Sequence, residues 1–237
     1  MIYIQSNTER NLPHHFDAAT ALYGAESLNL PYRLTSYEEV SSGKFDNLIK
    51  NNLFVGSVEF MTEVFNRVNK FPKRLPNSNR KTEICDIETA INRIESGEKL
   101  FIKSYDIKLF TGMVFEKIYL SMLNGYPKDT LVYVDKPFDA KIASEWRIYV
   151  DSGKMRDAKN YSGDFKLVPN WDSAQLMIDE FIECPICFTL DVAVLEDGNT
   201  ECVEFNDFWA IGNYGMPNDE YLSMLIKRYF EIICGNS

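Results

Sequence analysis

Apolar side chains recur along the first 70 residues with the spacing of short strands and amphipathic helices. Phe60, Val64 and Val68, for example, repeat at intervals of four and predict a helix with one buried face. Similar patterns predict a strand over 2–4, a helix over 14–24, a strand over 32–34, a strand at 54–55 and a helix over 59–68. Residues 1–75 are therefore predicted to form a small α/β domain.

A polar segment at 71–81 interrupts this pattern. It holds two prolines and three turn-forming residues, which indicates a linker and a domain boundary near residue 75. Beyond it, Asp86 can cap a helix that would stop at Gly97. A buried strand over 100–103, a helix over 116–124 and a strand over 131–134 complete a predicted lobe that spans residues 76–137.

The last hundred residues alternate hairpin patterns with helical ones. They predict a hairpin with arms at 145–150 and 154–161, a helix over 173–183, a hairpin with arms at 189–195 and 200–206, and a helix over 218–233. Asp197-Gly198, between the arms of the second hairpin, is a dipeptide that favours tight turns with positive φ. Residues 138–237 are predicted to form a second lobe.

The second hairpin carries two carboxylates that can face each other. If Asp197-Gly198 forms a two-residue turn, Asp191 lies directly opposite Glu204. Asn206 lies two residues beyond Glu204 and projects from the same face of the strand. Opposed like charges are destabilising unless positive charge lies between them, and Mg²⁺ or Mn²⁺ with oxygen ligands would resolve the conflict. The alternative is the solvated face of an ordinary amphipathic hairpin.

Two lysines in the predicted first lobe are candidates for contact with an anion. Lys103 closes the apolar strand over 100–103, and a lysine that faces inward from a strand needs an anionic partner. The loop after it contains Lys108 and ends in Thr111-Gly112, so it could approach phosphate oxygens. We therefore expect this side of the lobe to meet phosphate groups.

The first hairpin of the second lobe carries a candidate arginine. Arg147 alternates with Glu145 and Tyr149 on one strand face, where a planar guanidinium suits bidentate phosphate contact. A purely structural Glu–Arg pair is the alternative. Lys159 lies on the other arm and is opposite Arg147 if the turn at 151–153 has three residues, but not if it has two.

Composition narrows the classes of protein that fit. Apolar residues make up 45% of the 237 residues and aromatic residues 14%, so the chain can bury a substantial core. The formal charge of −10 disfavours broad attraction to nucleic acid or to an anionic membrane. The N-terminal residues lack the pattern of a signal peptide, and five cysteines suit reduced thiols, so a cytoplasmic protein with no membrane segment is expected.

Two weaker patterns suggest other functions. Residues 64–82 hold six basic and no acidic side chains, which would support a nucleic-acid-associated module, although most such runs are solvated linkers. Cys184 and Cys187 have the spacing of a redox dithiol or half a zinc site. Since there is no second cysteine pair, core thiols are the favoured interpretation.

Four segments taken together resemble the ATP-grasp superfamily in order and spacing. They are Phe101-Ile102-Lys103, Glu145-Trp146-Arg147, Leu190-Asp191-Val192 and Val203-Glu204-Phe205-Asn206-Asp207, followed by Trp209 and Gly212-Asn213-Tyr214-Gly215. The tail Glu-x-Asn-Asp with the following Trp and Gly-x-Tyr-Gly is the most specific signal. It is similar to a clade of short ATP-grasp proteins common in bacteria and their phages, over residues 85–234.

This resemblance implies an α+β fold in which two lobes clasp ATP, preceded by the small α/β domain. It implies that Lys103 contacts the nucleotide phosphates and that Arg147 lies near the transferred phosphoryl group. Tyr133, Val134 and Asp135 would form the hinge that faces adenine and ribose. The resemblance further implies that Mg²⁺, or Mn²⁺ in its place, is bound by three side chains, namely Asp191, Glu204 and Asn206.

The resemblance also implies a reaction. ATP-grasp enzymes usually phosphorylate a carboxylate to an acyl phosphate, which an amine or thiol then attacks, with ADP and phosphate as products. We therefore expect a carboxylate–amine ligase that acts on an amino acid, a peptide or a protein terminus, with the loop 208–215 bordering the acceptor. The alternatives are an ATP-grasp kinase that phosphorylates a hydroxyl and a nucleotide-binding or nucleic-acid-associated module without ligase turnover.

Overall fold

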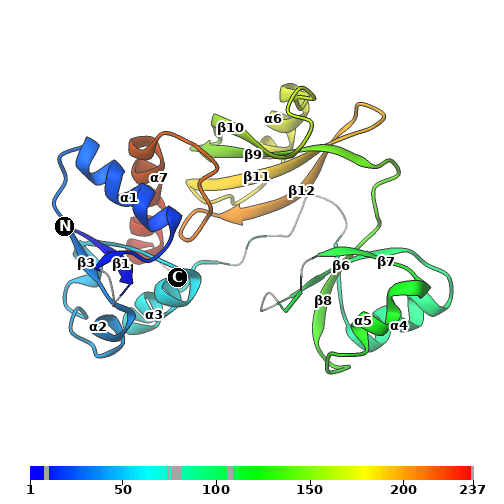
Figure 1. The fold of residues 1–237 in the computed structure, drawn as a ribbon, viewed down its shortest axis with the longest axis horizontal. Helices are drawn as coiled ribbons and strands as arrows, with labels where there is room; N and C mark the ends of the chain where they lie inside the picture. Colours follow the sequence, from blue (N-terminus) through cyan, green and yellow to red (C-terminus); the bar gives the residue numbers. More distant parts are fainter. Residues whose placement is uncertain (8–10, 74, 76–81, 106–108, 111, 236–237) are drawn as a thin grey trace.

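The structure is a computed structural model that describes residues 1–7, 11–73, 75, 82–105, 109–110 and 112–235. The described elements form three four-stranded sheets, which follow one another along the chain (Figure 1). The N-terminal unit lies at the left of Figure 1, the last unit at the top and the middle unit at the lower right. Helices and strands are mixed in every unit, which confirms the predicted α+β class.

The N-terminal unit is built around the central strand β1. Its strands are β1 (Ile2–Asn7), β2 (Leu12–Pro13), β3 (Tyr32–Thr35) and β4 (Leu53–Val55), and its helices are α1 (Phe16–Ser27), α2 (Tyr37–Ser41), η1 (Ile49–Asn51, 3-10) and α3 (Val58–Val68). β3 and β4 pair with β1 in parallel, whereas β2 pairs in antiparallel. Parallel strands need crossover helices, and α1 and α2 lie in those connections. The predicted α/β pattern is confirmed here.

The middle unit is a small antiparallel sheet with its own core. Its elements are β5 (Glu83–Asp86), α4 (Ile87–Glu95), β6 (Leu100–Ser104), β7 (Met113–Phe115), η2 (Lys117–Tyr119, 3-10), α5 (Leu120–Leu123) and β8 (Leu131–Asp135). The strand order is β5-β8-β6-β7. Asp86 caps α4 as predicted, since its carboxylate accepts a hydrogen bond from the backbone N–H of Thr89 at 2.7 Å. The helix predicted over 116–124 is instead the short pair η2 and α5, neither of which has a side-chain cap.

The last unit is a second antiparallel sheet in the order β10-β9-β11-β12. Its elements are β9 (Ile142–Asp151), β10 (Lys154–Gly163), α6 (Trp171–Asp179), β11 (Cys187–Leu195), β12 (Thr200–Asp207) and α7 (Asn218–Cys234). One face packs against α6 through a cluster that includes Ile148, Leu190 and Phe205. The central strand β11 is buried throughout, because the other face is covered as well.

Both hairpins of this unit differ from their predicted turns. Leu195 and Asn199 close a turn of three residues in which Gly198 has a φ of 87°, so the predicted two-residue turn is wrong. A bulge between Asp191 and Val192 then shifts the register by one residue. Because the bulge compensates for the longer turn, Asp191 still pairs with Glu204, as predicted.

The first hairpin reaches its register by the opposite route. Asp151 pairs with Lys154, which leaves a turn of two residues, Ser152 and Gly153, both with positive φ. A register shift between Met155 and Asp157 then adds one residue to β10. Lys159 therefore lies opposite Arg147, although the turn does not have the three residues on which the prediction made this depend.

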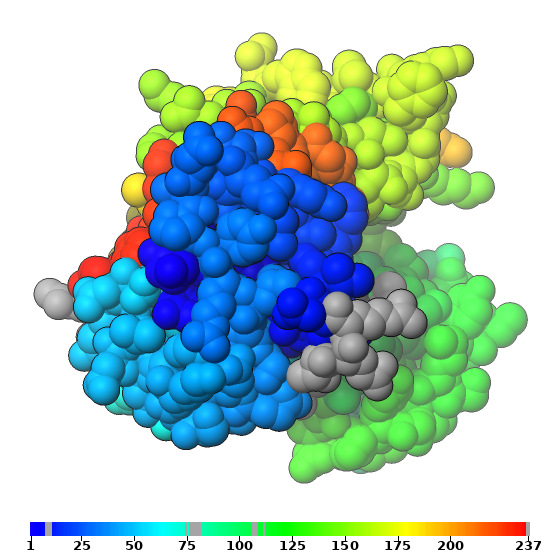
Figure 2. All heavy atoms as spheres, turned by 60° about the vertical axis from the view of Figure 1, so that its left-hand side comes forward, coloured from blue at the N-terminus to red at the C-terminus, as the bar shows by residue number. Residues whose placement is uncertain are grey.

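The C-terminal helix α7 joins the last unit to the N-terminal one. Side chains of α7, such as Leu222 and Tyr229, lie in one core cluster with β1, β4, α1 and α3 (Figure 2, where blue and cyan residues meet orange and red ones). At Gly24 of α1, a Cβ atom would lie 2.3 Å from the carbonyl oxygen of Asn218, so only glycine permits this approach. We keep the division at residues 75 and 137 as a proposal, with α7 as an element shared between two units.

Within the part of the chain that the structure describes, no helix has the length and apolar character needed to span a bilayer.

Candidate active site

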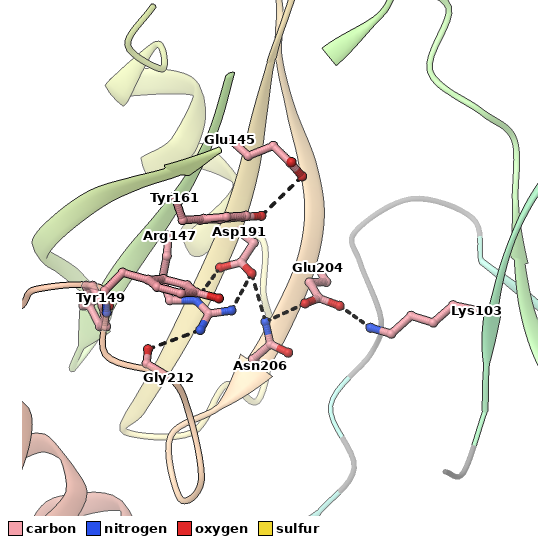
Figure 3. Close-up of polar contacts among 10 residues, drawn as sticks. Lys103, Glu145, Arg147, Tyr149, Tyr161, Asp191, Glu204, Asn206 and Gly212 are labelled. Carbon is pink, nitrogen blue, oxygen red and sulfur yellow. Dashed lines mark hydrogen bonds and ion pairs between the residues drawn. The ribbon is translucent and has the colours of Figure 1, made fainter. Parts of the chain in front are cut away.

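The open face of the second sheet carries the predicted site residues. Arg147 on β9, Asp191 on β11 and Glu204 on β12 are successive cross-strand neighbours. Asn206 lies two residues along β12 on the same face, and Lys103 reaches across from β6 of the middle unit (Figure 3). Strand pairing therefore brings together five residues that are distant in sequence, from two different sheets.

Arg147 and Asp191 form a buried bidentate ion pair. The arginine Nε and Nη2 atoms donate to the two carboxylate oxygens at 2.8 and 2.7 Å, and the side chains are only 7% and 3% exposed. Burial raises the pKa of Asp191 to about 6, although Arg147 opposes this shift, so the carboxylate is ionised at neutral pH. A third arginine donor, Nη1, lies 3.3 Å from the carbonyl oxygen of Gly212. All these contacts hold the guanidinium in one orientation.

Glu204 is the point where the two lobes meet. Its carboxylate forms an ion pair with the ammonium group of Lys103 and accepts a hydrogen bond from the Asn206 amide at 3.1 Å. Burial opposes the ionisation of Glu204, but Lys103 and Asn206 outweigh it and lower the pKa of this carboxyl. The Asn206 amide also lies 3.4 Å from Asp191, so the three predicted metal ligands form one connected cluster.

The donor atoms of this cluster fit a hard divalent cation. Asp191, Glu204 and Asn206 offer carboxylate and amide oxygens, the type of ligand that Mg²⁺ and Mn²⁺ take. Among the described residues, no group of three or more His, Cys, Asp or Glu side chains could hold a metal ion, so the cluster offers two carboxylates and one amide. Both carboxylates have cationic partners here, which indicates that their surroundings favour positive charge. Each carboxylate oxygen has a second lone pair that the arginine fork leaves available.

The other predicted nucleotide-binding residues are dispersed. Lys159 lies opposite Arg147 on β10, but its ammonium group forms an ion pair with Asp157 at 3.0 Å. Lys108 lies outside the described residues. Thus Lys159 is near the guanidinium in register, and its charge is matched by a carboxylate of its own strand.

The predicted hinge is strand β8. Tyr133 pairs with Lys103 across the sheet, and its ring lies 5.0 Å from the ring of Tyr105. Val134 is buried in the core of the middle unit, so only its backbone could face a nucleotide. Asp135 is 3% exposed and accepts a hydrogen bond from the hydroxyl of Thr82 at 2.8 Å.

Two tyrosines near Arg147 were not singled out by sequence reasoning. The ring of Tyr214 lies 4.7 Å from the guanidinium carbon and stacks on the ring of Tyr161 at 5.1 Å. The Tyr161 hydroxyl donates to Glu145 at 3.3 Å. Tyr214 belongs to the motif Gly-x-Tyr-Gly, so the sequence held a signal for it. Tyr161 lies at a register shift of β10, which no sequence pattern announces.

The basic stretch over 64–82 is largely engaged within the protein where it is described. Arg67 donates to Asp46 at 2.8 Å, and Lys70 donates to the carbonyl oxygen of Gly235 at 2.8 Å. Lys73 forms an ion pair with Glu183. Arg74, Arg80 and Lys81 lie outside the described residues. These ion pairs give no support to a nucleic-acid surface.

Solved structures of similar fold are ATP-grasp enzymes. The ligase PsnB, solved with precursor peptide PsnA2 and AMPPNP, has a TM-score of 0.54 at 9% identity, with 96% of each chain covered. D-Cycloserine synthetase DcsG has a TM-score of 0.54 at 10% identity, covering 96% of this chain and 99% of the other. D-alanine–D-alanine ligase from Bacillus anthracis has a TM-score of 0.51 at 10% identity, covering 98% and 97%. At these identities the likeness establishes the ATP-grasp fold.

The family follows from the sequence. Residues 78–224 match the model of a family described as an ATP-grasp domain, the second family of its clade. A comparison with curated protein sequences gives no match. The chain therefore belongs to the ATP-grasp superfamily and, within it, to this clade family, which makes it an ATP-dependent ligase at the level of the family. The predicted fold and family are confirmed.

Proposed function

We propose that the protein is a carboxylate–amine ligase that uses ATP and Mg²⁺ and acts on an amino acid or peptide. The observation that carries this proposal is the meeting of Lys103, from one lobe, with Arg147, Asp191, Glu204 and Asn206 on the other (Figure 3). Phosphoryl transfer depends mainly on positioning and on neutralisation of charge, and this cluster offers two cations beside oxygen donors for a metal.

The oxygens of Asp191, Glu204 and Asn206 would hold the metal. When bound, Mg²⁺ supplies positive charge that offsets the charge of the phosphate oxygens. Lys103 and Arg147 would bind phosphate oxygens directly, the first as a point charge and the second as a planar fork. In the structure Lys103 pairs with Glu204, so the same ammonium group is within reach of the metal-binding strand.

The proposed reaction proceeds in two steps. A carboxylate oxygen of the first substrate attacks the γ-phosphorus of ATP, the bond from this phosphorus to the bridging oxygen breaks, and ADP leaves. The amine of the second substrate then attacks the acyl carbon, phosphate leaves and the extra proton passes to solvent. Arg147 is suited to the first step because Asp191, Gly212 and Tyr214 fix its orientation before substrate arrives.

The substrate class has support from the structural relatives. One is a ligase solved with a precursor peptide, and another is named as a D-alanine–D-alanine ligase. Both names refer to amino-acid or peptide substrates. For this chain we infer the same broad class, with the loop 208–215 beside the acceptor, because Gly212 and Tyr214 of this loop contact Arg147.

Release of ADP tests the proposal. The protein is incubated with ATP, Mg²⁺ and pools of amino acids and short peptides, and ADP and condensed products are measured by mass spectrometry. We expect substrate-dependent ADP release without pyrophosphate and a product lighter by one water than the sum of its substrates. A phosphorylated product in place of a condensed one would identify a kinase instead.

Trapping with hydroxylamine separates the two reactions further. An acyl phosphate gives a hydroxamate, whereas a phosphorylated hydroxyl does not. The Glu204→Gln variant serves as the inactive control, and Glu180→Gln, at the exposed end of α6, is the matched control with the same chemical change. ADP release that is unaffected by Glu204→Gln would contradict the site assignment.

A further inference from the structure

A second pocket lies between the N-terminal unit and the loop that follows β12. It has a volume of about 280 Å³ and is bounded by the carboxyl end of β4, the first turns of α1 and α3, and residues 209–211. Ligands of open α/β sheets bind outside the carboxyl ends of the parallel strands, and β4 is parallel to β1. The position is therefore one where this type of sheet binds small molecules.

The charged groups of the pocket are acidic. Asp17 and Glu59 line it together with His15, and no lysine or arginine is among its lining residues, all of which the structure describes. Burial lowers the pKa of the His15 imidazole, so this ring is neutral at neutral pH. Hydrogen bonds from its own backbone amide and from Ser57 lower the pKa of Glu59, so this carboxylate is ionised. The pocket therefore carries net negative charge.

The two helix ends at the pocket have internal caps. His15 Nδ1 accepts the backbone N–H of Ala18 at 3.2 Å, and Ser57 Oγ accepts that of Phe60 at 3.3 Å. A helix N-terminus attracts anions mainly through such N–H groups. Because these donors already have acceptors and two carboxylates lie beside them, the site is less suited to an anion than to a cation.

The remaining walls are apolar and shaped for a small group. They come from Val55, Val58, Trp209, Ile211 and Leu225. The Trp209 ring packs edge-on against Phe65, with 5.5 Å between ring centroids, so this wall is held in place by the core. The pocket volume is at or below the lower end of the range for small-molecule sites, about 300 Å³.

One loop connects this pocket with Arg147. Trp209 and Ile211 face the pocket, while the next residue, Gly212, accepts a hydrogen bond from Arg147 at 3.3 Å. Asp17 holds the same loop, because its carboxylate accepts the backbone N–H of Asn213 at 2.7 Å. A molecule in the pocket therefore lies against the loop that positions the phosphate-binding arginine.

We propose that this pocket binds the amine-bearing substrate, with its ammonium group beside Asp17 and Glu59 and a small apolar side group against Trp209 and Ile211. Two carboxylates without a basic neighbour recognise a cation, and the apolar walls limit the rest of the molecule. The fate of the amine, attack on an acyl phosphate, rests on the proposed function. The binding itself does not depend on it.

Two probes with opposite charge test the recognition. Alaninamide has an ammonium group and no carboxylate, whereas N-acetylalanine has a carboxylate and no amine. Binding of each to the full-length protein is measured by ligand-observed saturation-transfer NMR, without ATP. We expect alaninamide to bind and N-acetylalanine not to bind. Preference for N-acetylalanine, or absence of binding by both, overturns the proposal.

Variants then assign the binding to the pocket. Glu59→Gln should weaken alaninamide binding about two- to five-fold, the range expected for one exposed ion pair. Glu63→Gln, one turn further along α3 and outside the pocket lining, is the matched control and should have no effect. Ala210→Phe should fill the pocket and abolish binding, with circular dichroism to verify folding. Unchanged alaninamide affinity in folded Glu59→Gln and Ala210→Phe proteins contradicts the assignment.

The same variants separate this inference from the proposed function. If alaninamide binds in the pocket but no amine gives ADP release or product, the pocket assignment stands and the ligase proposal fails. If ligase activity is present and the KM for amine is unchanged in Glu59→Gln and Ala210→Phe, the ligase proposal stands and the pocket assignment fails.

Discussion

Two buried Arg–Asp forks in this protein have nearly the same geometry and very different surroundings. Arg147 grips Asp191 at 2.7 and 2.8 Å, and Arg228 grips Asp207 at 2.6 and 2.5 Å. Both arginine side chains are 7% exposed. A bidentate pair that excludes water is therefore not by itself a sign of an active site.

The surroundings separate the two forks. Arg228 has its remaining Nη1 contact with Glu231 at 2.8 Å, and Glu231 accepts the backbone N–H of Ile186, so this cluster ties α7 to the last sheet. Arg147 instead lies under the ring of Tyr214, and its partner Asp191 adjoins a polar cluster that reaches the other lobe. The first fork fastens a helix, whereas the second offers a fixed guanidinium at the place where two lobes meet.

The largest effect is expected from the neighbour that makes the Arg147 fork a functional site. Glu204→Gln removes the charge that binds the metal, so it should lower Mg²⁺-dependent ADP release at least about 10²-fold, the typical effect of losing one electrostatic contact in a transition state. Thermal unfolding should change little, because Lys103, 34% exposed, can be solvated. Coupled ADP assays and calorimetry measure the two effects, and Glu180→Gln should change neither.

The next effect concerns the fork itself. Arg147→Lys keeps the charge but loses the planar fork, so kcat should fall by about 10-fold to 10²-fold, corresponding to one or two charge-assisted hydrogen bonds. Steady-state kinetics on the purified variant, corrected for its folded fraction, check this result. Activity equal to that of wild type would mean that Arg147 is structural, like Arg228.

The matching change in the other fork should act on stability. Arg228→Lys leaves Asp207 partly unpaired in a buried site and should cost about 2–4 kcal/mol, which lowers Tm by about 4–16 °C for a chain of this size. The kcat of the folded protein at low temperature should remain within about three-fold of wild type, a shift of under 1 kcal/mol. A large loss of kcat without a loss of Tm would reverse the roles of the two forks.

The smallest effect should come from the ring over Arg147. Tyr214→Leu removes a cation–π contact of about 0.5–2 kcal/mol and should lower kcat about two- to thirty-fold. Tyr214→Phe keeps the ring and the backbone N–H that donates to Tyr149, so it should restore kcat. Comparing kcat and KM for both variants separates a role in orientation from a role in packing; equal activity of Tyr214→Leu and wild type would exclude either.

Local chemistry made much of the fold predictable. The cap at Asp86, the apolar spacing of α3 and the alternation of β11 and β12 all depend on residues a few positions apart. Such signals operate before any tertiary contact forms. Elements without them were missed or misjudged: the short strand β5 has no alternation, and the helix predicted over 116–124 lacks a cap and breaks into two pieces.

The facing of Asp191 and Glu204 shows how a correct expectation can rest on an incomplete reason. The turn has one residue more than predicted, and the bulge after Asp191 cancels the difference. Turn length follows from local sequence, but a bulge depends on how the strand packs against its neighbours. The register was therefore predictable only because two deviations compensate.

What the sequence determined by itself is the inventory of chemistry: hard oxygen donors at Asp191, Glu204 and Asn206, and basic side chains at Lys103 and Arg147. The tertiary structure decided which of these groups meet. The pairing of Arg147 with Asp191 spans 44 residues and that of Lys103 with Glu204 spans 101. Contacts over such separations depend on the register of strands and the docking of lobes, which local propensities do not encode.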